Sequence, residues 1–344
     1  MKLLYCALLL LLIHSSGYSQ DTTHKISSKK FFTEESLCSA TFTADLGALL
    51  NNKNKESTTK AVFSMKLPDS SVVSEEVELK PRGNFRLENC YIPPLKVDFK
   101  GTGSGRLSSL KSLKLVNGCS TGSSNDQLLI KEFLIYKMFN VLCEMSFRVR
   151  MMNITLEDSK KRKKTMTFHS FFIEDIDEMA KRNNCRKWDE KKKINTETTN
   201  REHMTFVSIF QYMIGNTDWS VPGNHNIRLI STKSDSLSRP YAIPYDFDYA
   251  GLVNAPYATP DEHLGTTSVL ERVYRGFPRT MEELKTIIQP FRDKKDKIYA
   301  IVQGCELLSS RNKNEMIGYL DSFYQLIATD RNLKTLFIDN ARSE

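Results

Sequence analysis

The sequence predicts an α+β protein with two lobes, a strand-rich N-terminal lobe and a mainly helical C-terminal lobe. Three observations lead to this fold class. In residues 60–118, apolar and polar residues alternate in short segments, which is the pattern of half-buried strands. Residues 281–328 instead carry apolar residues at the 3.6-residue spacing of helices. The chain has 344 residues, which is long enough to form a large core in two lobes or two domains.

The first twenty residues have the pattern of a secretory signal peptide. Lys2 precedes an apolar run over residues 3–13, which is too short to span a bilayer as a permanent helix. Small and polar residues follow the run, so we expect cleavage near Gln20 and export to the periplasm, the cell surface or the medium. No later stretch is long and apolar enough to span a membrane, so we expect no transmembrane segment in the mature chain.

The formal net charge of +8 is concentrated partly in one basic segment, residues 160–164. Such a segment is most often a solvated turn, and the alternative is binding to an anionic substrate or envelope polymer. We expect no nucleic-acid partner. Six cysteines follow the signal peptide, and their even number permits disulfides in an exported chain. Their wide spacing, without a Cys-x-x-Cys motif, argues against zinc, and the sequence leaves the pairing open.

Residues 21–175 are assigned to the N-terminal lobe, which we expect to consist of strands around one helix. Residues 61–67 and 73–80 flank a Pro-Asp-Ser-Ser turn, a pattern typical of a hairpin. The other expected elements are strands at 94–100 and 112–118, a helix at 127–144, a second hairpin of 147–158 and 165–175, and a short helix at 175–184.

Residues 176–344 are assigned to the C-terminal lobe. A helix is predicted over 201–214, because Gly215 and Asn216 form a stop signal at its end. We expect Pro290 to break or kink a later helix. The expected elements after the first helix are strands at 227–230 and 241–247 and helices at 281–303 and 311–328.

Carboxylate and amide side chains occur in a characteristic order around the two C-terminal strands. Asp218 lies in the loop after the long helix, Asn224 and Asn226 precede the first strand, and Asp246 and Asp248 follow the second. Each one alone is explained by a turn cap or a strand end. Phosphoryl transfer, however, needs anionic oxygens that hold magnesium and a carboxylate near the attacking hydroxyl. Their shared order is the order in which a protein-kinase-like fold presents these groups.

Four segments of the chain resemble the spore coat protein H (CotH) kinase-like family and, more closely, its exported bacterial relatives. They are RGNFR…PPLKVDF, LLIKEFLIYKMF, FQYMIGNTDWSVPGNHNIRLI and YAIPYDFDYAGLV. The resemblance covers roughly residues 40–335, and the pair GNTDW and YDFD is its most specific part. It implies an atypical kinase fold, and some members of the family phosphorylate secreted or coat proteins with ATP and a divalent metal.

The resemblance also implies roles for individual residues of the C-terminal lobe. Asp218 matches the catalytic Asp that orients the acceptor hydroxyl. Asp246 matches the Asp that binds Mg²⁺ or Mn²⁺, with Asp248 as the second choice for this role. Asn226 matches the metal-binding Asn before the strand.

The nucleotide-binding residues implied by the resemblance lie in the N-terminal lobe. Arg82 and Gly83, followed by Asn84, match the loop over the phosphates, and Lys96 matches the strand lysine that contacts phosphate oxygens. Glu132 is the candidate to pair with that lysine. Backbone groups of residues 174–176 are expected either to meet the adenine edge or simply to cap a helix through Asp175.

The sequence also departs from the protein-kinase pattern, because it has no H-R-D triplet, no D-F-G triplet and no G-x-G-x-x-G loop. The expected function is that of an exported atypical kinase. It would transfer phosphate from ATP to a hydroxyl group on an exported protein or envelope polymer. Two alternatives stay open: a catalytically silent binding module, and a nucleotidyl transferase that uses the same metal site.

Overall fold

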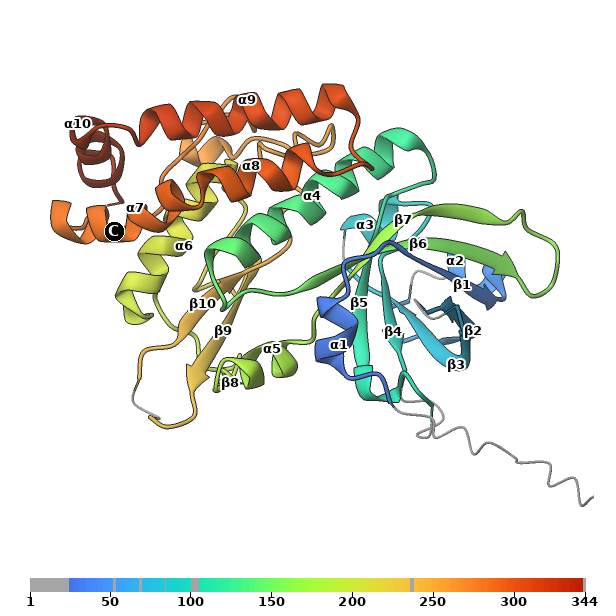
Figure 1. Cartoon of the computed structure of the whole chain (residues 1–344). Coiled ribbons are helices and arrows are strands. Elements are labelled where there is room, and N and C mark those ends of the chain that lie inside the picture. Colours follow the sequence, from blue (N-terminus) through green and yellow to red (C-terminus); the bar gives the residue numbers. More distant parts are fainter. Residues whose placement is uncertain are drawn as a thin grey trace, which may run out of the picture.

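The computed structural model describes residues 25–51, 54–67, 70–83, 85–99, 105–235 and 238–342. The predicted signal peptide, residues 1–20, and Asn84 lie outside these ranges. A β-barrel and a mainly helical part lie side by side (Figure 1). Within the described ranges, no helix combines the length and the apolarity that crossing a membrane requires.

The N-terminal part is a closed barrel of seven strands in the order β1-β2-β3-β4-β5-β7-β6. Neighbouring strands are antiparallel except β1 and β6, whose parallel pairing closes the barrel. The bounds of the strands are β1 Cys38–Ala44, β2 Thr59–Lys66, β3 Val72–Pro81, β4 Leu95–Asp98, β5 Ser112–Asn117, β6 Val149–Asp158 and β7 Met166–Ile173.

The predicted fold class, an atypical protein-kinase-like fold of two lobes, is therefore wrong. Closure of the sheet overturns it, because a typical two-lobed kinase fold does not contain a closed seven-stranded barrel. Cys38 pairs with Met152, which lies 114 positions further along the chain (152 minus 38). The local pattern at residues 147–158 predicts a strand, but no strand was predicted at residues 38–44, and pairing at this separation leaves no local signal.

The C-terminal part packs helices against a three-stranded antiparallel sheet of order β10-β9-β8. These strands are β8 Cys185–Lys187, β9 Ile227–Thr232 and β10 Tyr241–Pro244. The α-helices of the described ranges are α1 Ser28–Thr33, α2 Leu46–Asn51, α3 Phe85–Asn89, α4 Ser123–Leu142, α5 Ile176–Arg182, α6 Arg201–Ile214, α7 Met281–Asp293, α8 Lys295–Gln303, α9 Ser310–Leu326 and α10 Asp330–Lys334.

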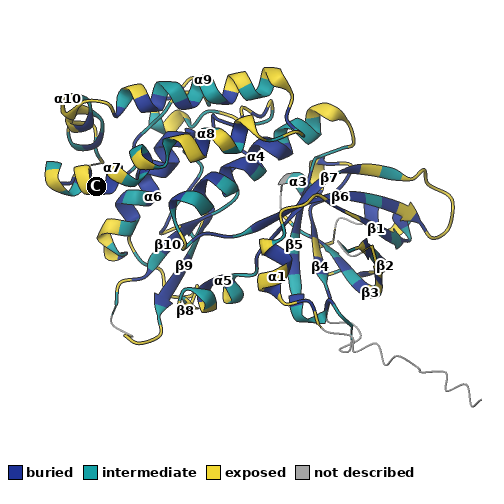
Figure 2. Ribbon diagram, in the orientation of Figure 1, coloured by how far each residue is buried: buried dark blue, intermediate teal, exposed yellow. Residues whose placement is uncertain are grey.

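The buried apolar residues form two hydrophobic cores (Figure 2). The first fills the barrel, where the rings of Phe63 and Phe99 meet edge to face with centroids 5.5 Å apart. The second lies among the C-terminal helices and includes the buried side of α4, which packs on both β7 and α8. Helix α4 is thus the element that joins the barrel to the helical part. It carries side chains of the candidate site described below.

A disulfide between Cys90 and Cys119 links the end of α3 to the segment after β5. It closes a loop of 29 positions, for which chain entropy predicts a stabilisation of about 3 to 4 kcal/mol. In the described ranges the other cysteines are free thiols: Cys38, Cys143, Cys185 and Cys305. The bond anchors α3, which directly follows the predicted phosphate loop.

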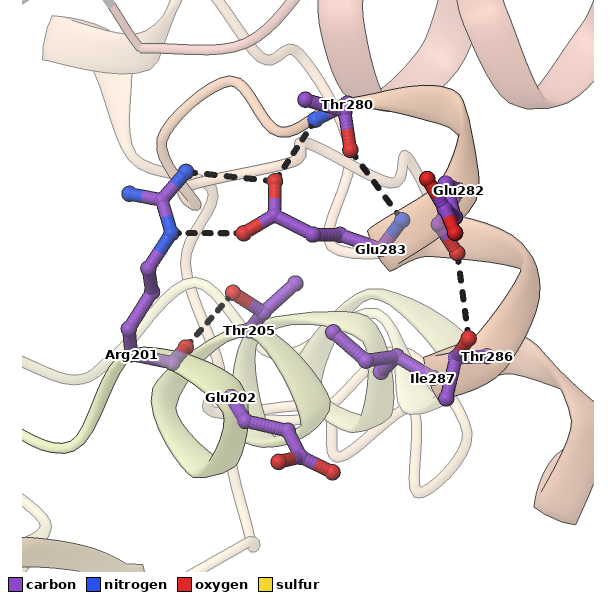
Figure 3. Close-up of a pocket in the computed structure, with 8 residues that line it drawn as sticks. All are labelled: Arg201, Glu202, Thr205, Thr280, Glu282, Glu283, Thr286 and Ile287. Carbon is purple, nitrogen blue, oxygen red and sulfur yellow. Dashed lines mark hydrogen bonds and ion pairs between the residues drawn. The ribbon is translucent and has the colours of Figure 1, made fainter.

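Helices α6 and α7 are joined by an ion pair beside a cavity of about 400 Å³ (Figure 3). The carboxylate of Glu283 accepts hydrogen bonds from Arg201 Nε at 2.7 Å and from the backbone N–H of Thr280 at 2.8 Å. Thr280 in turn caps α7 by accepting from the backbone N–H of Glu283. These bonds, that of Arg201 first, lower the pKa of Glu283 to about 2.

We expect Glu283→Gln to lower the free energy of unfolding by about 1 kcal/mol at pH 7, since a third-exposed ion pair is weakened by solvent. The pKa of Glu283 is lowered on folding, so its stabilisation is present above about pH 4.5 and is lost as the pH falls towards 2. Urea unfolding between pH 2 and 7 measures this difference. Glu282→Gln, one residue away, is the control and should change stability by less than about 0.5 kcal/mol.

Helix α7 contains Pro290 and ends at Asp293, and α8 begins at Lys295. The predicted break of the 281–303 helix therefore exists, but it lies several residues after the proline. The backbone N–H of Lys294 donates to the carbonyl of Pro290 at the junction.

Candidate functional site

The loop between α6 and β9 carries Asp218, and Arg275 binds the backbone of the residues directly before and after it. Nη1 of Arg275 donates hydrogen bonds to the carbonyls of Thr217 and Trp219, and its guanidinium lies 5.2 Å from the Trp219 ring centroid. The loop starts at Gly215, whose φ of 66° is left-handed and whose missing Cβ leaves room for the Tyr319 hydroxyl. Both contacts hold the backbone around Asp218 in one place.

The Asp218 carboxylate is held by two side chains. Nδ2 of Asn226 donates to Asp218 Oδ2 at 2.9 Å and to the Asp218 carbonyl at 2.8 Å. Nε2 of His225 lies 2.7 Å from Asp218 Oδ1. Because both of these bonds use Nδ2, the Oδ1 atom of Asn226 is the one that can bind a metal. In the sequence His225 directly precedes Asn226, but its contact with Asp218 across seven positions is visible only in the structure.

Asp246 follows β10 in a backbone conformation that few residue types adopt. Its φ is 64°, and its backbone N–H donates to the Tyr136 hydroxyl of α4 at 2.8 Å. Asp and Asn tolerate the left-handed region better than most residues, and such conformations cluster at functional sites. The turn leaves the Asp246 side chain half-buried at the end of the strand.

Asp248 lies deeper than Asp246 and beside it. The side chain is buried and accepts a hydrogen bond from the Tyr257 hydroxyl at 3.1 Å. Burial first, and then the negative charge of Asp246, raise the pKa of Asp248 to about 7, while Arg86 opposes the shift. The negative charge of Asp218 raises the pKa of Asp248 further, so the carboxylates of the two loops interact electrostatically.

Glu132 of α4 belongs to the same acidic group. It is 3 % exposed, and its Oε1 has no hydrogen-bond partner in the described part of the chain. Burial raises its pKa well above the usual value, and Asp248 and Asp246 raise it further. The predicted Lys96–Glu132 ion pair is absent among the described residues, because Lys96 lies exposed on the outer face of β4, opposite Leu95 and Val97 of the barrel core.

Two basic side chains, Arg82 and Lys114, interact electrostatically with the acidic group, which consists of Glu132, Asp246 and Asp248. The two are called the basic wall below. Nε of Arg82 donates to the Leu95 carbonyl at 3.2 Å, and the charge of Asp246 opposes the lowering of the Arg82 pKa by burial. Lys114 of β5 is half-buried, with Nζ 4.6 Å from the Tyr245 ring centroid. Burial first, and then the charge of Arg82, lower the pKa of Lys114 to about 8, and the charge of Asp246 works in the opposite direction.

Lys114 is the lysine that sequence reasoning missed. It is the Cα partner of Lys96 on the neighbouring strand, so both side chains leave the same face of the sheet. The alternation in SLKLVNG placed Lys114 on that face, and pairing of the two strands was the missing information.

A cavity of about 240 Å³ lies between β4 and β5, the segment after β7 and the three-stranded sheet of the C-terminal part. Its lining includes Lys96, Lys114, Arg228 and Tyr245, together with residues 174–176, for which the sequence analysis left two roles open. Asp175 does cap α5, accepting from the backbone N–H of Asp177 at 3.0 Å. The two roles are compatible, since capping uses the side chain and a ligand would meet the backbone.

The structure thus gathers most of the predicted site residues and separates others. Gly83 adopts a φ of 86° and is exposed, and Lys96 lies in the neighbouring cavity rather than beside Glu132. The predicted residues linked by hydrogen bonds or by their effect on each other's pKa are Arg82, Glu132, Asp218, Asn226, Asp246 and Asp248.

The acidic group fits a divalent metal only as a partial ligand set. Across the described ranges, no three His, Cys, Asp or Glu side chains are arranged to hold a metal ion. Magnesium, however, is usually held by one or two carboxylates together with substrate phosphates and water. Asp246, Asp248 and Asn226 can supply such a set. The buried Oε1 atom of Glu132, which lacks a partner among the described residues, is a further sign that the group suits a cation.

Comparison of the chain with protein-family models finds no match, and comparison with curated protein sequences finds none either. The resemblance to the CotH kinase-like family stays a prediction.

Proposed function

We propose that the protein is an exported, metal-dependent phosphotransferase related to the CotH kinase-like family. It transfers the γ-phosphate of ATP to a hydroxyl group of an exported protein or envelope polymer. The observation that carries this proposal is the Asp218 carboxylate, held by Asn226 and His225 and electrostatically linked to Asp248. Its side chain is 36 % exposed, so an acceptor hydroxyl can reach it.

Each group has a role that follows from its position. Asp218 orients the acceptor hydroxyl and takes its proton as the hydroxyl oxygen bonds to the γ-phosphorus and the bond to ADP breaks. Asp246, Asp248 and Asn226 hold Mg²⁺ or Mn²⁺, which neutralises phosphate charge when it is bound. Lys114 contacts phosphate oxygens, because it lies on the basic wall opposite Asp246.

Export has its own support. The apolar run after Lys2 is typical of a signal peptide, and the Cys90–Cys119 disulfide suits an oxidising compartment. N-terminal sequencing of the mature protein tests this part, and we expect the chain to begin near Gln20. A mature protein that begins at Met1 would falsify it.

Label transfer tests the reaction itself. The mature chain is incubated with Mg²⁺ or Mn²⁺, casein as a hydroxyl-bearing acceptor, and ATP labelled on either the γ- or the α-phosphate. Protein-bound label from the γ-phosphate alone supports the proposal. Label from the α-phosphate indicates nucleotidyl transfer, and ATP binding without any transfer indicates a silent binding module.

The proposal also predicts how ATP binding depends on pH. Lys114 has a pKa of about 8, so it is charged at pH 7 and loses its charge as the pH rises through 8. We expect ATP affinity to fall between pH 7 and 9 in calorimetric titrations with Mg²⁺. Lys114→Gln should bind about tenfold more weakly at pH 7 and show a flatter profile.

Lys80→Gln is the matched control for this measurement. Lys80 lies on β3, which β4 separates from β5, and it does not line the cavity that contains Lys114. Its loss should leave both the affinity and the pH profile unchanged. An unaltered profile in Lys114→Gln would remove Lys114 from the phosphate site.

A further inference from the structure

The barrel end at which β1 and β6 begin contains a buried arginine. Arg150 of β6 alternates in step with Met152 and Ile154, which belong to the barrel core, so it extends into the barrel interior. The short helix α1 covers this end of the barrel (Figure 1), and its Phe31 ring packs on Phe172 of β7 at 5.8 Å. Arg150 is 4 % exposed as a result.

Only part of the Arg150 guanidinium is bonded within the protein. Nη1 donates to the Phe31 carbonyl at 2.9 Å, and the group lies over the Phe31 ring, 4.6 Å from its centroid. The Nε and Nη2 atoms are buried without an acceptor among the described residues. Buried polar groups nearly always have hydrogen-bond partners, and a charged group is costly to leave unpaired.

A second arginine faces the same space. Arg106, from the connection between β4 and β5, lines a cavity of about 210 Å³ together with Arg150, and its Nε is also buried without an acceptor in the described ranges. Lys30 and Glu34 are the other charged residues that line this cavity. The Glu34 carboxylate already accepts from the Ser36 hydroxyl at 2.8 Å. The lining therefore has three positive charges and one negative charge.

The rest of the lining is apolar, and the cavity is small. Ile26, Met65 and Leu67 contribute hydrocarbon surface. The volume equals that of roughly seven water molecules in the liquid, at about 30 Å³ each. It lies below the range of about 300 to 1,000 Å³ typical of pockets for drug-sized ligands. The apolar surface favours a ligand that carries hydrocarbon beside its charge.

We propose that this cavity binds a small organic carboxylate, whose oxygens accept from Arg150 and Arg106 and whose hydrocarbon part packs on Ile26, Met65 and Leu67. Guanidinium groups match the planar carboxylate, and bonds between two charged groups are stronger than neutral ones. The apolar part of the lining favours such a ligand over inorganic phosphate, which has no hydrocarbon part. The site shares no lining residue with the cavity beside Lys114, so it does not depend on the proposed phosphotransferase function.

Calorimetric titration of the mature chain with hexanoate, hexanamide and inorganic phosphate tests the proposal. We expect hexanoate to bind at one saturable site, and hexanamide and phosphate to bind at least about tenfold more weakly. Arg150→Gln and Arg106→Gln should each weaken hexanoate binding by about tenfold or more. Arg162→Gln makes the same charge change at the exposed turn between β6 and β7, and it should have no effect.

Arg106→Gln is included because Arg150→Gln could fail to fold. Arg106 is less buried than Arg150 and lies in a connection rather than in a strand. If circular dichroism shows that Arg150→Gln does not fold, Arg106→Gln alone decides. The proposal is overturned if wild type does not saturate with hexanoate, or if hexanamide or phosphate binds as tightly. It is also overturned if folded Arg106→Gln binds hexanoate like wild type.

Discussion

Asp246→Asn should lower the affinity for metal-bound ATP by about a hundredfold or more. The half-buried Asp246 carboxylate is the ligand that a metal can reach most directly at the end of β10. Without its charge, the complex of the divalent metal and the nucleotide phosphates loses a principal anionic ligand. Asparagine tolerates the left-handed φ of 64°, so the backbone and the bond to the Tyr136 hydroxyl should persist.

Asp248→Asn should have a smaller effect, about tenfold. Asp248 is buried, and its pKa is raised to about 7, so near neutral pH it carries a proton about half of the time. Titration calorimetry with Mg²⁺ or Mn²⁺ compares the two variants, and Asp296→Asn on the exposed side of α8 is the control. A larger loss in Asp248→Asn would reverse the two assignments. Wild-type protein that binds no ATP with either metal would refute the metal–nucleotide site altogether.

Local sequence patterns were informative where the structure depends on local interactions. The helix predicted over 201–214 is confirmed as α6, Arg201–Ile214, because its stop signal and its apolar spacing lie within the segment itself. The hairpin predicted around residues 68–71 is also confirmed, by the antiparallel pairing of β2 and β3. In both cases the residues that determine the element are close in the chain.

The features that were missed depend on residues far apart in the chain. Closure of the barrel needs β1 to find β6, and no pattern inside either strand specifies its partner. The choice of Lys96 over Lys114 failed for a related reason, since the two are Cα partners on adjacent strands and only burial distinguishes them. Glu132 was identified as a site residue, but its neighbours proved to be acids rather than a lysine.

Asp218→Asn should separate chemistry from binding. It removes the group that takes the acceptor proton, so γ-phosphate transfer should fall by about a hundredfold or more. ATP affinity should change by less than about twofold, because Asp218 lies in the loop before β9 and not among the proposed ligands of the phosphates. The amide oxygen of the new side chain can still accept from Asn226 Nδ2, which keeps the loop in place.

His225→Gln distinguishes orientation from proton transfer at the same carboxylate. Nε2 of His225 lies 2.7 Å from Asp218 Oδ1, and a glutamine amide can replace this bond only with looser geometry. A loss of about tenfold is expected, smaller than that of Asp218→Asn, because the carboxylate remains and only its position is less fixed. Single-turnover transfer of labelled γ-phosphate at saturating ATP measures both variants. Equal losses of transfer rate in the two variants would indicate that His225 takes part in the proton transfer itself. A wild-type transfer rate in Asp218→Asn would refute the assignment of Asp218 as the group that takes the acceptor proton.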